Sequence, residues 1–274
     1  MSQGYVDCGG GRMYYEVAGE GAPVVLCHAG FVDSRMWDDQ WAALAQRCRV
    51  IRFDMRGFVR SAALDGPVCR RADLYALLEQ LGVGPAVLVG CSLGGELALD
   101  AALERPELAS ALILVSAVPS GFAMAGAPPS ELLQMIDALG RGDLGLAEDL
   151  QMQLWMAGQG RTLEQVDAEA VRRARAMARV ALANGTWQQA DISPLDPLDP
   201  PAAARLGQLA RPALVIAGAL DHPEVLRAAG VLADGIPVAQ QVVMGGCAHV
   251  PNMEQPELFS RHIFSFLQQH DFLL

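Results

Sequence analysis

The chain has 274 residues, of which 52% are hydrophobic, and carries a formal net charge of −11. This length suits one α/β domain with an insertion, and the apolar content favours a large buried core over disorder. An acidic surface repels phosphate backbones, which argues against a nucleic-acid partner.

The cysteines and the N-terminus bear on the cellular setting. The six cysteines form no C-x-x-C pair and no cluster with zinc-ligand spacing. No basic segment followed by an apolar stretch opens the chain, so no secretory signal is expected. These features predict a reduced, cytoplasmic setting. An uncharged stretch at 108–130 is interrupted by serine, glycine and proline, which favours a strand and loop over a membrane span.

The first elements resemble an antiparallel hairpin, with strands at 5–8 and 13–17 around three glycines. Short apolar runs then alternate with helical patterns, which is typical of a parallel sheet with crossover helices. Because most runs are continuously apolar, we expect helices on both faces of the sheet. Strands are expected at 24–27, 50–53, 86–89, 112–115, 213–217 and 241–244, and helices at 71–81, 93–103 and 256–268.

The alternation breaks once, where roughly a hundred residues separate the strands at 112–115 and 213–217. A single crossover needs far fewer residues. Helical patterns occur in this stretch at 130–139, 144–156 and 163–184, and a proline-rich segment at 193–201 leads out of it. We therefore expect a core formed by 1–119 and 206–274, with 120–205 inserted as a helical lid, or cap.

The strongest local motif is G-x-S-x-G, at Gly90-Cys91-Ser92-Leu93-Gly94. It follows an apolar strand and opens a helix rich in alanine and leucine, which is the context of a nucleophile elbow. Glycines on both sides of Ser92 remove Cβ clashes in a tight turn, and the helix N-terminus favours a developing oxyanion. We predict Ser92 as a nucleophile rather than as a serine in a glycine-rich turn.

A serine hydroxyl needs a base within hydrogen-bond reach. His249 follows the last expected strand, at the sheet edge where sites form in open α/β folds. His262 and His270 lie in the expected terminal helix or at its end, and His222 directly follows Asp221, the candidate for the triad acid. His249 is therefore the predicted base.

The third group must be a carboxylate that fixes the imidazole tautomer. Asp221 follows the strand at 213–217 and gives the chain order Ser, Asp, His. Its alternative role is to cap a helix that begins near Pro223. Asp54, at the end of an earlier strand, is the competing carboxylate. Chain order favours Asp221.

An oxyanion hole needs two backbone donors. One donor is expected to be the N–H of Leu93. The other is expected from the loop that follows the strand at 24–27, with Gly30 first and Phe31 next. His28 is interpreted as a residue that orders this loop, without a catalytic role.

Together these motifs resemble the lidded α/β-hydrolase superfamily, and within it the small bacterial esterases and enol-lactonases. The resemblance rests on segments 28–31, 54–61, 90–95, 218–221 and 247–251, which follow the family order over nearly the whole chain. The chain departs from the family pattern where Ala29 and Val59 replace glycines. Dehalogenases and epoxide hydrolases carry aspartate at the elbow, so Ser92 argues against both.

The leading interpretation is a carboxylesterase, a serine esterase of the carboxylic ester hydrolase class that forms an acyl-enzyme without a metal or organic cofactor. A lactonase of the enol-lactone type and a hydrolase of carbon–carbon bonds remain alternatives. A non-catalytic receptor on the same fold is a fourth reading, against which the intact set of Ser92, His249 and Asp221 argues. The expected partner is a small-molecule ester or lactone, with no nucleic acid and no membrane, and the chain is expected to be a monomer or homodimer.

The expected lid is rich in methionine, which adapts to varied apolar shapes. Candidate pocket residues are Trp155, Met152, Met156, Met124 and Val250, although such residues can instead pack the lid on the core. The arginines of this region are expected on a solvated helix face, although one of them could bind a substrate carboxylate. They are Arg161, Arg172, Arg173, Arg175 and Arg179.

Overall fold

The computed structural model describes residues 1–191 and 194–273, which contain one eight-stranded sheet of order β1-β2-β4-β3-β5-β6-β7-β8. The hairpin strands β1 and β2 pair antiparallel, and β2 pairs antiparallel with β4, whereas the remaining pairs are parallel. The predicted mostly parallel α/β sheet is therefore confirmed. The strands are β1 Ser2–Cys8, β2 Gly11–Ala18, β3 Pro23–Cys27, β4 Arg49–Phe53, β5 Ala86–Cys91, β6 Ala109–Val115, β7 Ala213–Gly218 and β8 Ala239–Met244.

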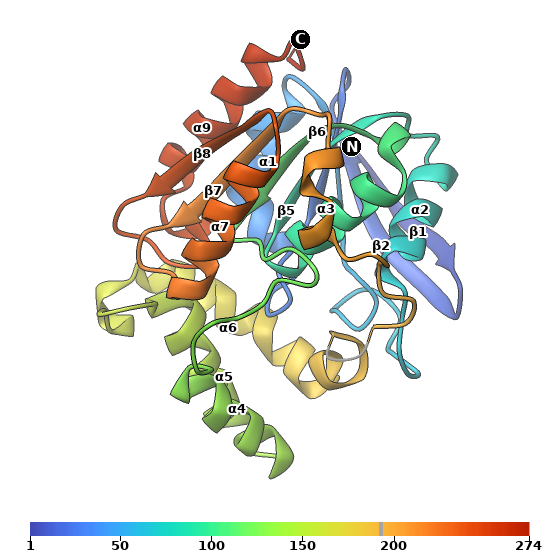
Figure 1. Cartoon of the computed structure of the whole chain (residues 1–274). Helices are drawn as coiled ribbons and strands as arrows, with labels where there is room; N and C mark the ends of the chain where they lie inside the picture. Colours follow the sequence, from blue (N-terminus) through green and yellow to red (C-terminus); the bar gives the residue numbers. More distant parts are fainter. Residues whose placement is uncertain (192–193, 274) are drawn as a thin grey trace.

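Helices cover both faces of this sheet (Figure 1). Helices α2 (Arg70–Gln80), α3 (Leu93–Glu104) and α7 (Pro223–Gly235) pack on one face, and α1 (Asp38–Ala45) and α9 (Pro256–Gln269) pack on the other. Successive strand residues point to opposite faces, so the buried runs of β3 to β7 supply both layers of the core. This explains why the strands read as continuously apolar.

A long insertion connects β6 to β7 and lies beyond one end of the sheet, where α4 and α5 project away from it (Figure 1). Its helices are α4 (Ser130–Gly140), α5 (Leu144–Met152) and α6 (Ala168–Ala183), and a π-helical turn (Gln153–Ala157) continues α5. The two ends of the insertion meet at Ser120, whose hydroxyl and carbonyl oxygens accept the N–H groups of Ala202 and Ala203 at 2.9 and 3.0 Å. The insertion therefore leaves and rejoins the core at one place.

The inner and outer parts of the insertion pack differently. Residues of α6 and of the end of α5, such as Met152 and Met177, belong to the same buried cluster as Trp37 and Phe259. The outer part has a small cluster of its own, formed by Met135, Ala138 and Ala147. The inner helices thus share the core of the sheet, whereas α4 packs mainly on its neighbours in the insertion.

The remaining elements complete the described chain and include several that the sequence analysis did not anticipate. Helix α1 and the short α8 (Pro251–Glu254) were not predicted, whereas a helix beginning near Pro223 was expected and is α7. Residue 193, the first of the predicted proline-rich segment, lies outside the described residues. Within the residues that are described, no helix is long and apolar enough to cross a bilayer. Short turns of 3₁₀ or π helix occur at Ser34–Trp37, Pro106–Leu108, Leu163–Gln165, Trp187–Asp191, Ala202–Ala204 and Leu206–Gln208.

Candidate active site

Ser92 lies in the turn between β5 and α3, at the carboxyl edge of the sheet. Its backbone has φ 52° and ψ −118°, a combination that non-glycine residues rarely adopt. Its N–H donates to the carbonyl oxygen of Val115 on β6 at 2.8 Å. A Cβ at Gly90 would clash with the carbonyl oxygen of Gly94, and one at Gly94 with that of Cys27. The strand–turn–helix context expected for the motif is present, and both glycines are sterically required.

His249 and Asp221 lie against each other in the loops that follow β8 and β7. Nδ1 of His249 is 2.8 Å from Oδ2 and 3.0 Å from Oδ1 of Asp221, and the two residues are only 2% and 1% exposed. The carboxylate holds a proton on Nδ1, which leaves Nε2 as an acceptor. The helix cap of α7 is His222, whose Nδ1 accepts the N–H of Glu224 at 3.2 Å. The Asp221 carboxylate therefore does not cap that helix.

The turn at Ser92 and the loop at His249 are close neighbours. The thiol of Cys91 lies 3.6 Å from the carbonyl oxygen of His249, and the Trp155 ring lies 4.4 Å from the imidazole and lines the same cavity as Ser92. Among the described residues, the hydrogen bonds of the His249 ring are those to Asp221, and none joins it to Ser92. Catalytic hydrogen bonds of this kind often tighten only with substrate. A direct bond between Ser92 and His249 stays a prediction.

The His249 loop is also tied to the insertion. Its N–H donates to the carbonyl oxygen of Trp155 at 3.2 Å. Arg161 donates to backbone carbonyl groups of both segments and pairs with Glu254 at 2.5 Å. The other carboxylate oxygen of Glu254 accepts the N–H of Ala248 at 2.8 Å. Arg161, expected on a solvated face, is instead enclosed between the insertion and this loop.

The loop at 28–31 lies beside the first turn of α3. A Cβ on Gly30 would lie 3.3 Å from Cδ2 of Leu93, and both residues line one cavity with Phe31 and Ser92. The N–H groups of Gly30, Phe31 and Leu93 donate to no other residue in the described part of the chain. Such unpaired donors beside a nucleophile are suited to an oxyanion.

His28 fixes the shape of that loop. Its Nε2 accepts the N–H of Met55 at 3.0 Å, so the proton resides on Nδ1, which donates to the carbonyl oxygen of Ala29 at 2.9 Å. Burial lowers the pKa of His28, and this favours the neutral ring. Ala29 is fully buried against Met36, whereas Val59, the other departure from the family pattern, is 36% exposed and does not line the cavity.

Ser92 opens into a cavity of about 240 Å³ that lies between the core and the insertion. Four other core residues and seven residues of the insertion line it with Ser92. They are Gly30, Phe31, Leu93 and Glu96 from the core, and Leu132, Met135, Leu139, Gln151, Trp155, Leu182 and Trp187 from the insertion. The sequence carried a signal for some of these, because Glu96 is one helical turn after Ser92, and 132, 135 and 139 are spaced along one helix face.

The five predicted pocket residues lie in different places. Trp155 lines the cavity, as predicted. Met152, Met156 and Val250 are completely buried in the core beneath it, and Met124 is 58% exposed. Positions 151 and 155 face the cavity, so the residues that follow each of them point to the neighbouring face of the helix and pack on the core.

None of the five arginines of the insertion lines this cavity. Arg172, Arg173 and Arg179 pair with acidic side chains instead, namely Glu169, Asp39 and Glu148. Glu96 is the charged residue among the described residues that line this cavity, and no arginine or lysine is among those lining residues. This lining thus carries no cationic side chain of its own, whereas Arg70 and Arg71 line a neighbouring cavity that shares Leu93 and Glu96 with it.

The competing carboxylate, Asp54, has structural partners. Its Oδ2 accepts from Arg60 at 2.7 Å and its Oδ1 accepts the N–H of Ser34 at 3.1 Å. Burial alone would raise the pKa of Asp54, but the hydrogen bonds and charge of Arg60 hold it below its ordinary value. Within the described residues, no group of three or more His, Cys, Asp or Glu side chains is placed to hold a metal ion.

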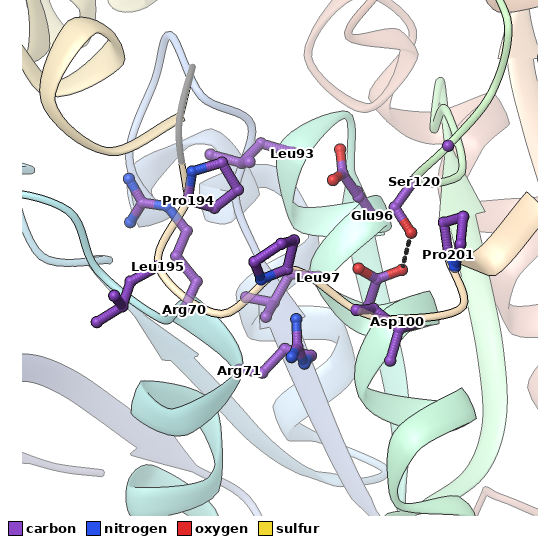
Figure 2. A pocket seen from close by; sticks show the side chains of 13 residues that line it. Arg70, Arg71, Leu93, Glu96, Leu97, Asp100, Ser120, Pro194, Leu195 and Pro201 are labelled. Carbon is purple, nitrogen blue, oxygen red and sulfur yellow. Dashed lines mark hydrogen bonds between the residues drawn. The ribbon is translucent and has the colours of Figure 1, made fainter.

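A second cavity, of about 180 Å³, adjoins the first, and Leu93 and Glu96 line both. Figure 2 shows it between α2, α3 and the segment 194–201, with the Ser120 hydroxyl donating to Asp100 at 2.7 Å. Burial raises the pKa of Asp100, although this hydrogen bond opposes the shift. The second cavity thus lies where the insertion joins the core.

Comparisons with known proteins agree with this fold. A family model described as "alpha/beta hydrolase fold" matches residues 22–256. A pimeloyl-[acyl-carrier protein] methyl ester esterase of Aliivibrio fischeri is 30% identical over 94% of this chain and 98% of its own length. The structure of a thermophilic esterase from Thermogutta terrifontis is 25% identical with a TM-score of 0.78, and covers 98% of this chain and 99% of its own. An enol-lactonase structure from Burkholderia xenovorans, at 23% identity and TM-score 0.79 over 97% and 100% of the two chains, shares the fold.

Proposed function

Because the chain belongs to the alpha/beta hydrolase fold family, we propose that it is a serine hydrolase that cleaves carboxylic esters through an acyl-enzyme. One observation carries the proposal. The Asp221 carboxylate holds Nδ1 of His249 at 2.8 Å, and that imidazole packs on Trp155, which lines the same cavity as Ser92. A base of fixed tautomer close to a cavity-lining serine at a helix N-terminus is the arrangement that acyl transfer requires.

In the first half-reaction, Nε2 of His249 takes the proton of Ser92 as Oγ attacks the ester carbonyl carbon. The carbonyl oxygen becomes an oxyanion that accepts hydrogen bonds from the N–H groups of Leu93 and Gly30, with Phe31 as the next donor in the loop. The C–O bond then breaks, and His249 protonates the departing alcohol. Water repeats these steps on the acyl-enzyme and releases the acid.

We further propose that the insertion acts as a lid on this chemistry. Seven of the twelve residues lining the cavity belong to it. A movement of the insertion would therefore open or close the space above Ser92. Closing such a site expels water and strengthens the interaction between donors and oxyanion.

The same groups would open a lactone, which is a cyclic ester. A cavity of about 240 Å³ is smaller than the roughly 300–1,000 Å³ of sites for drug-sized ligands, and it would accommodate a small ring as well as a short linear ester. Linear esters are the first choice because a lactonase for acidic lactones would need a cation, which the described lining lacks.

The proposal is tested by turnover of p-nitrophenyl acetate and butyrate. We expect the wild type to hydrolyse both, and Ser92→Ala to lose at least about a thousand-fold in kcat, because removing a triad member disables the covalent step. Ser265→Ala, in the exposed part of α9, makes the same chemical change away from the cavity and should match the wild type.

Turnover by the wild type that survives in Ser92→Ala would contradict the assigned nucleophile. No turnover of any ester, with no burst of p-nitrophenol, would instead favour a binding protein on this fold. A panel of lactones and linear esters, together with a vinylogous diketone, then separates ester, lactone and carbon–carbon bond hydrolysis.

A further inference from the structure

The segment 153–161 of the insertion lies against both loops that carry the proposed acid and base. The N–H of Gln159 donates to the carbonyl oxygen of Leu220, the residue before the proposed acid, at 2.7 Å. The carbonyl oxygen of Trp155 accepts the N–H of His249 at 3.2 Å. This part of the insertion is therefore hydrogen-bonded to the backbone of both loops.

Gly158, in the middle of this segment, is required by the close approach of the same two loops. Its φ of 70° lies in the left-handed region that favours glycine. A Cβ at this position would clash with the carbonyl oxygen of Leu220 and with the side chain of Ala248. The insertion thus touches the loops so closely that a side chain has no room between them.

Arg161 joins this segment to the loop after β8 through all three nitrogens of its guanidinium group. On the insertion, Nε and Nη2 donate to the carbonyl oxygens of Ala157 and Met156 at 2.9 and 2.7 Å. On the other side, Nη1 donates to the carbonyl oxygen of Gly246 at 2.9 Å, and Nη2 pairs with Glu254 at 2.5 Å. A planar fork of fixed donors suits such a set of acceptors, and a lysine could not reproduce it.

Glu254 extends this connection to the residue before the proposed base. Its Oε1 accepts the N–H of Ala248 at 2.8 Å, while its other oxygen pairs with Arg161, and its side chain is only 4% exposed. Burial raises the pKa of Glu254, whereas the hydrogen bonds from Ala248 and Arg161 oppose the shift. Because a buried carboxylate is costly without its cation, Arg161 and Glu254 hold the Ala248 backbone as one unit.

The position of this loop matters for the proposed chemistry because the base and the nucleophile lie on different loops. Asp221 fixes the tautomer of His249, but the distance from the imidazole to Ser92 depends on where the backbone of the loop lies. A general base must come within hydrogen-bond reach, and a displacement of about 1 Å can cost about a hundredfold in rate. Arg161 is not among the described residues that line the Ser92 cavity, so any effect on the reaction is transmitted through the loop.

We propose that Arg161 is a positioning residue, whose guanidinium group, together with Glu254, fixes the loop after β8 so that the imidazole of His249 reaches Ser92. The inference rests on the proposed ester hydrolysis and adds a residue of the insertion to its machinery. Both half-reactions use this imidazole, so acylation and deacylation depend on Arg161 alike.

Steady-state kinetics on p-nitrophenyl butyrate test the inference. Arg161→Met keeps the apolar part of the side chain and removes its donors. We expect kcat to fall about a hundredfold, with KM within about twofold of the wild type because both half-reactions slow together. A merely structural role would lower Tm and leave kcat of the folded enzyme unchanged.

Arg172→Met is the matched control. It makes the same change on α6, where Arg172 pairs with Glu169 and its side chain is 69% exposed, and it should match the wild type. Arg161→Lys is the second variant, since it keeps the charge and loses the fork, and we expect it to lower kcat about tenfold. Circular dichroism and Tm check that each variant folds.

An unchanged kcat in folded Arg161→Met overturns the inference while ester hydrolysis stands. So does a raised KM at unchanged kcat, which would mean that Arg161 supports only the Trp155 wall of the cavity, and so does an equal loss in Arg172→Met. If Arg161→Met does not fold, wild-type kcat in Arg161→Lys overturns the inference instead. A wild type without any esterase activity contradicts the proposed function itself, so the two failures are distinguishable.

Discussion

The backbone of Ser92 is held at φ 52°, a conformation that costs a non-glycine residue roughly 1–3 kcal/mol. Two features of the surroundings maintain it. The N–H of Ser92 is fixed to β6 through Val115, and its carbonyl oxygen accepts the N–H groups of Gly95 and Glu96 at 2.8 and 2.9 Å. The turn presents the hydroxyl to the cavity because the sheet and α3 hold it from both sides.

The hydrogen bond between Asp221 and His249 gives a prediction at the residue scale. Asp221→Asn keeps the size of the side chain but offers the imidazole an amide, which permits the wrong tautomer. We expect kcat on p-nitrophenyl butyrate to fall about ten-thousand-fold with little change in KM. Steady-state kinetics at saturating ester measures this. A loss of less than about tenfold would show that the carboxylate does not orient the base.

At the residue scale, the sequence predicts the candidate catalytic residues, because acyl transfer requires particular residue types in a particular order. It does not predict residues whose position depends on how the insertion packs over the core. Motif context and chain order indicated Ser92, Asp221 and His249, and the structure places the last two in contact. Gln151 carries no comparable signal. Whether a single polar residue of a helix faces the cavity or solvent depends on how the insertion packs over Ser92, and local periodicity does not specify that.

Element boundaries differ from the sequence-based expectation where distant residues compete for backbone groups. The pattern at 144–156 predicts one continuous helix, but α-helical bonding ends at Met152 and a π-helical turn follows. In that turn the carbonyl oxygen of Trp155 accepts the N–H of His249, and Arg161 binds the next two carbonyl groups. These partners come from outside the segment, so its own sequence does not reveal them.

The helix expected at 163–184 begins later for a local reason. A 3₁₀ turn at Leu163–Gln165 comes first, and the Asp167 side chain then accepts the N–H of Ala170 at 2.8 Å as the cap of α6. Aspartate is a favoured helix cap, so this boundary was available from the sequence. Helix α7, which was expected to begin near Pro223, likewise has buried apolar residues at helical spacing.

Arg60 gives a prediction of pH dependence, because it joins β2, the residue that follows β4 and the first residue of the Ser34–Trp37 turn. It donates to Glu16 at 2.6 Å, to Asp54 at 2.7 Å and to the hydroxyl of Ser34 at 2.7 Å. Burial favours a raised pKa for both carboxyl groups, but their arginine partners hold each pKa below its ordinary value. A carboxyl group whose pKa is lower in the folded protein than in the unfolded chain stabilises the fold at pH values above its unfolded pKa, which is about 4. That stability is lost as the pH falls through the folded pKa.

Arg60→Met removes the arginine that pairs with Asp54 and one of the two that pair with Glu16, which keeps Arg52. We expect it to lower the unfolding free energy at pH 7 by about 3 kcal/mol, and the difference from the wild type should shrink as the pH falls below about 4. Urea titrations at several pH values measure both quantities. A difference that stays constant from neutral to acidic pH would mean that ionisation of Glu16 and Asp54 does not contribute.

At the scale of the whole molecule, the sequence predicted the position of the insertion because the break in the βα alternation is large. It did not reveal that the inner helices of the insertion share a core with Trp37 and Phe259. Membership of that cluster is a property of the assembled fold, since Met177 and Phe259 are distant in sequence. We propose that the insertion unfolds together with the sheet rather than as a separate domain.

The four tryptophans allow a direct test of that cooperativity. Trp37 and Trp41 lie in the core, whereas Trp155 and Trp187 belong to the insertion. Replacing one pair at a time by phenylalanine leaves fluorescence that reports on the other part. The urea midpoint of each variant should coincide with its own far-ultraviolet circular dichroism midpoint. An insertion signal that changes at clearly lower urea than the circular dichroism would contradict shared unfolding.

We propose that His249 activates Ser92 above one edge of the sheet, and covalent labelling provides a direct test of this activation. A fluorophosphonate probe followed by peptide mass spectrometry locates the reactive residue without knowledge of the substrate. We expect a single adduct on Ser92, formed at least about a thousand-fold more slowly in His249→Asn. An adduct on another residue, or an unchanged labelling rate in that variant, would contradict it.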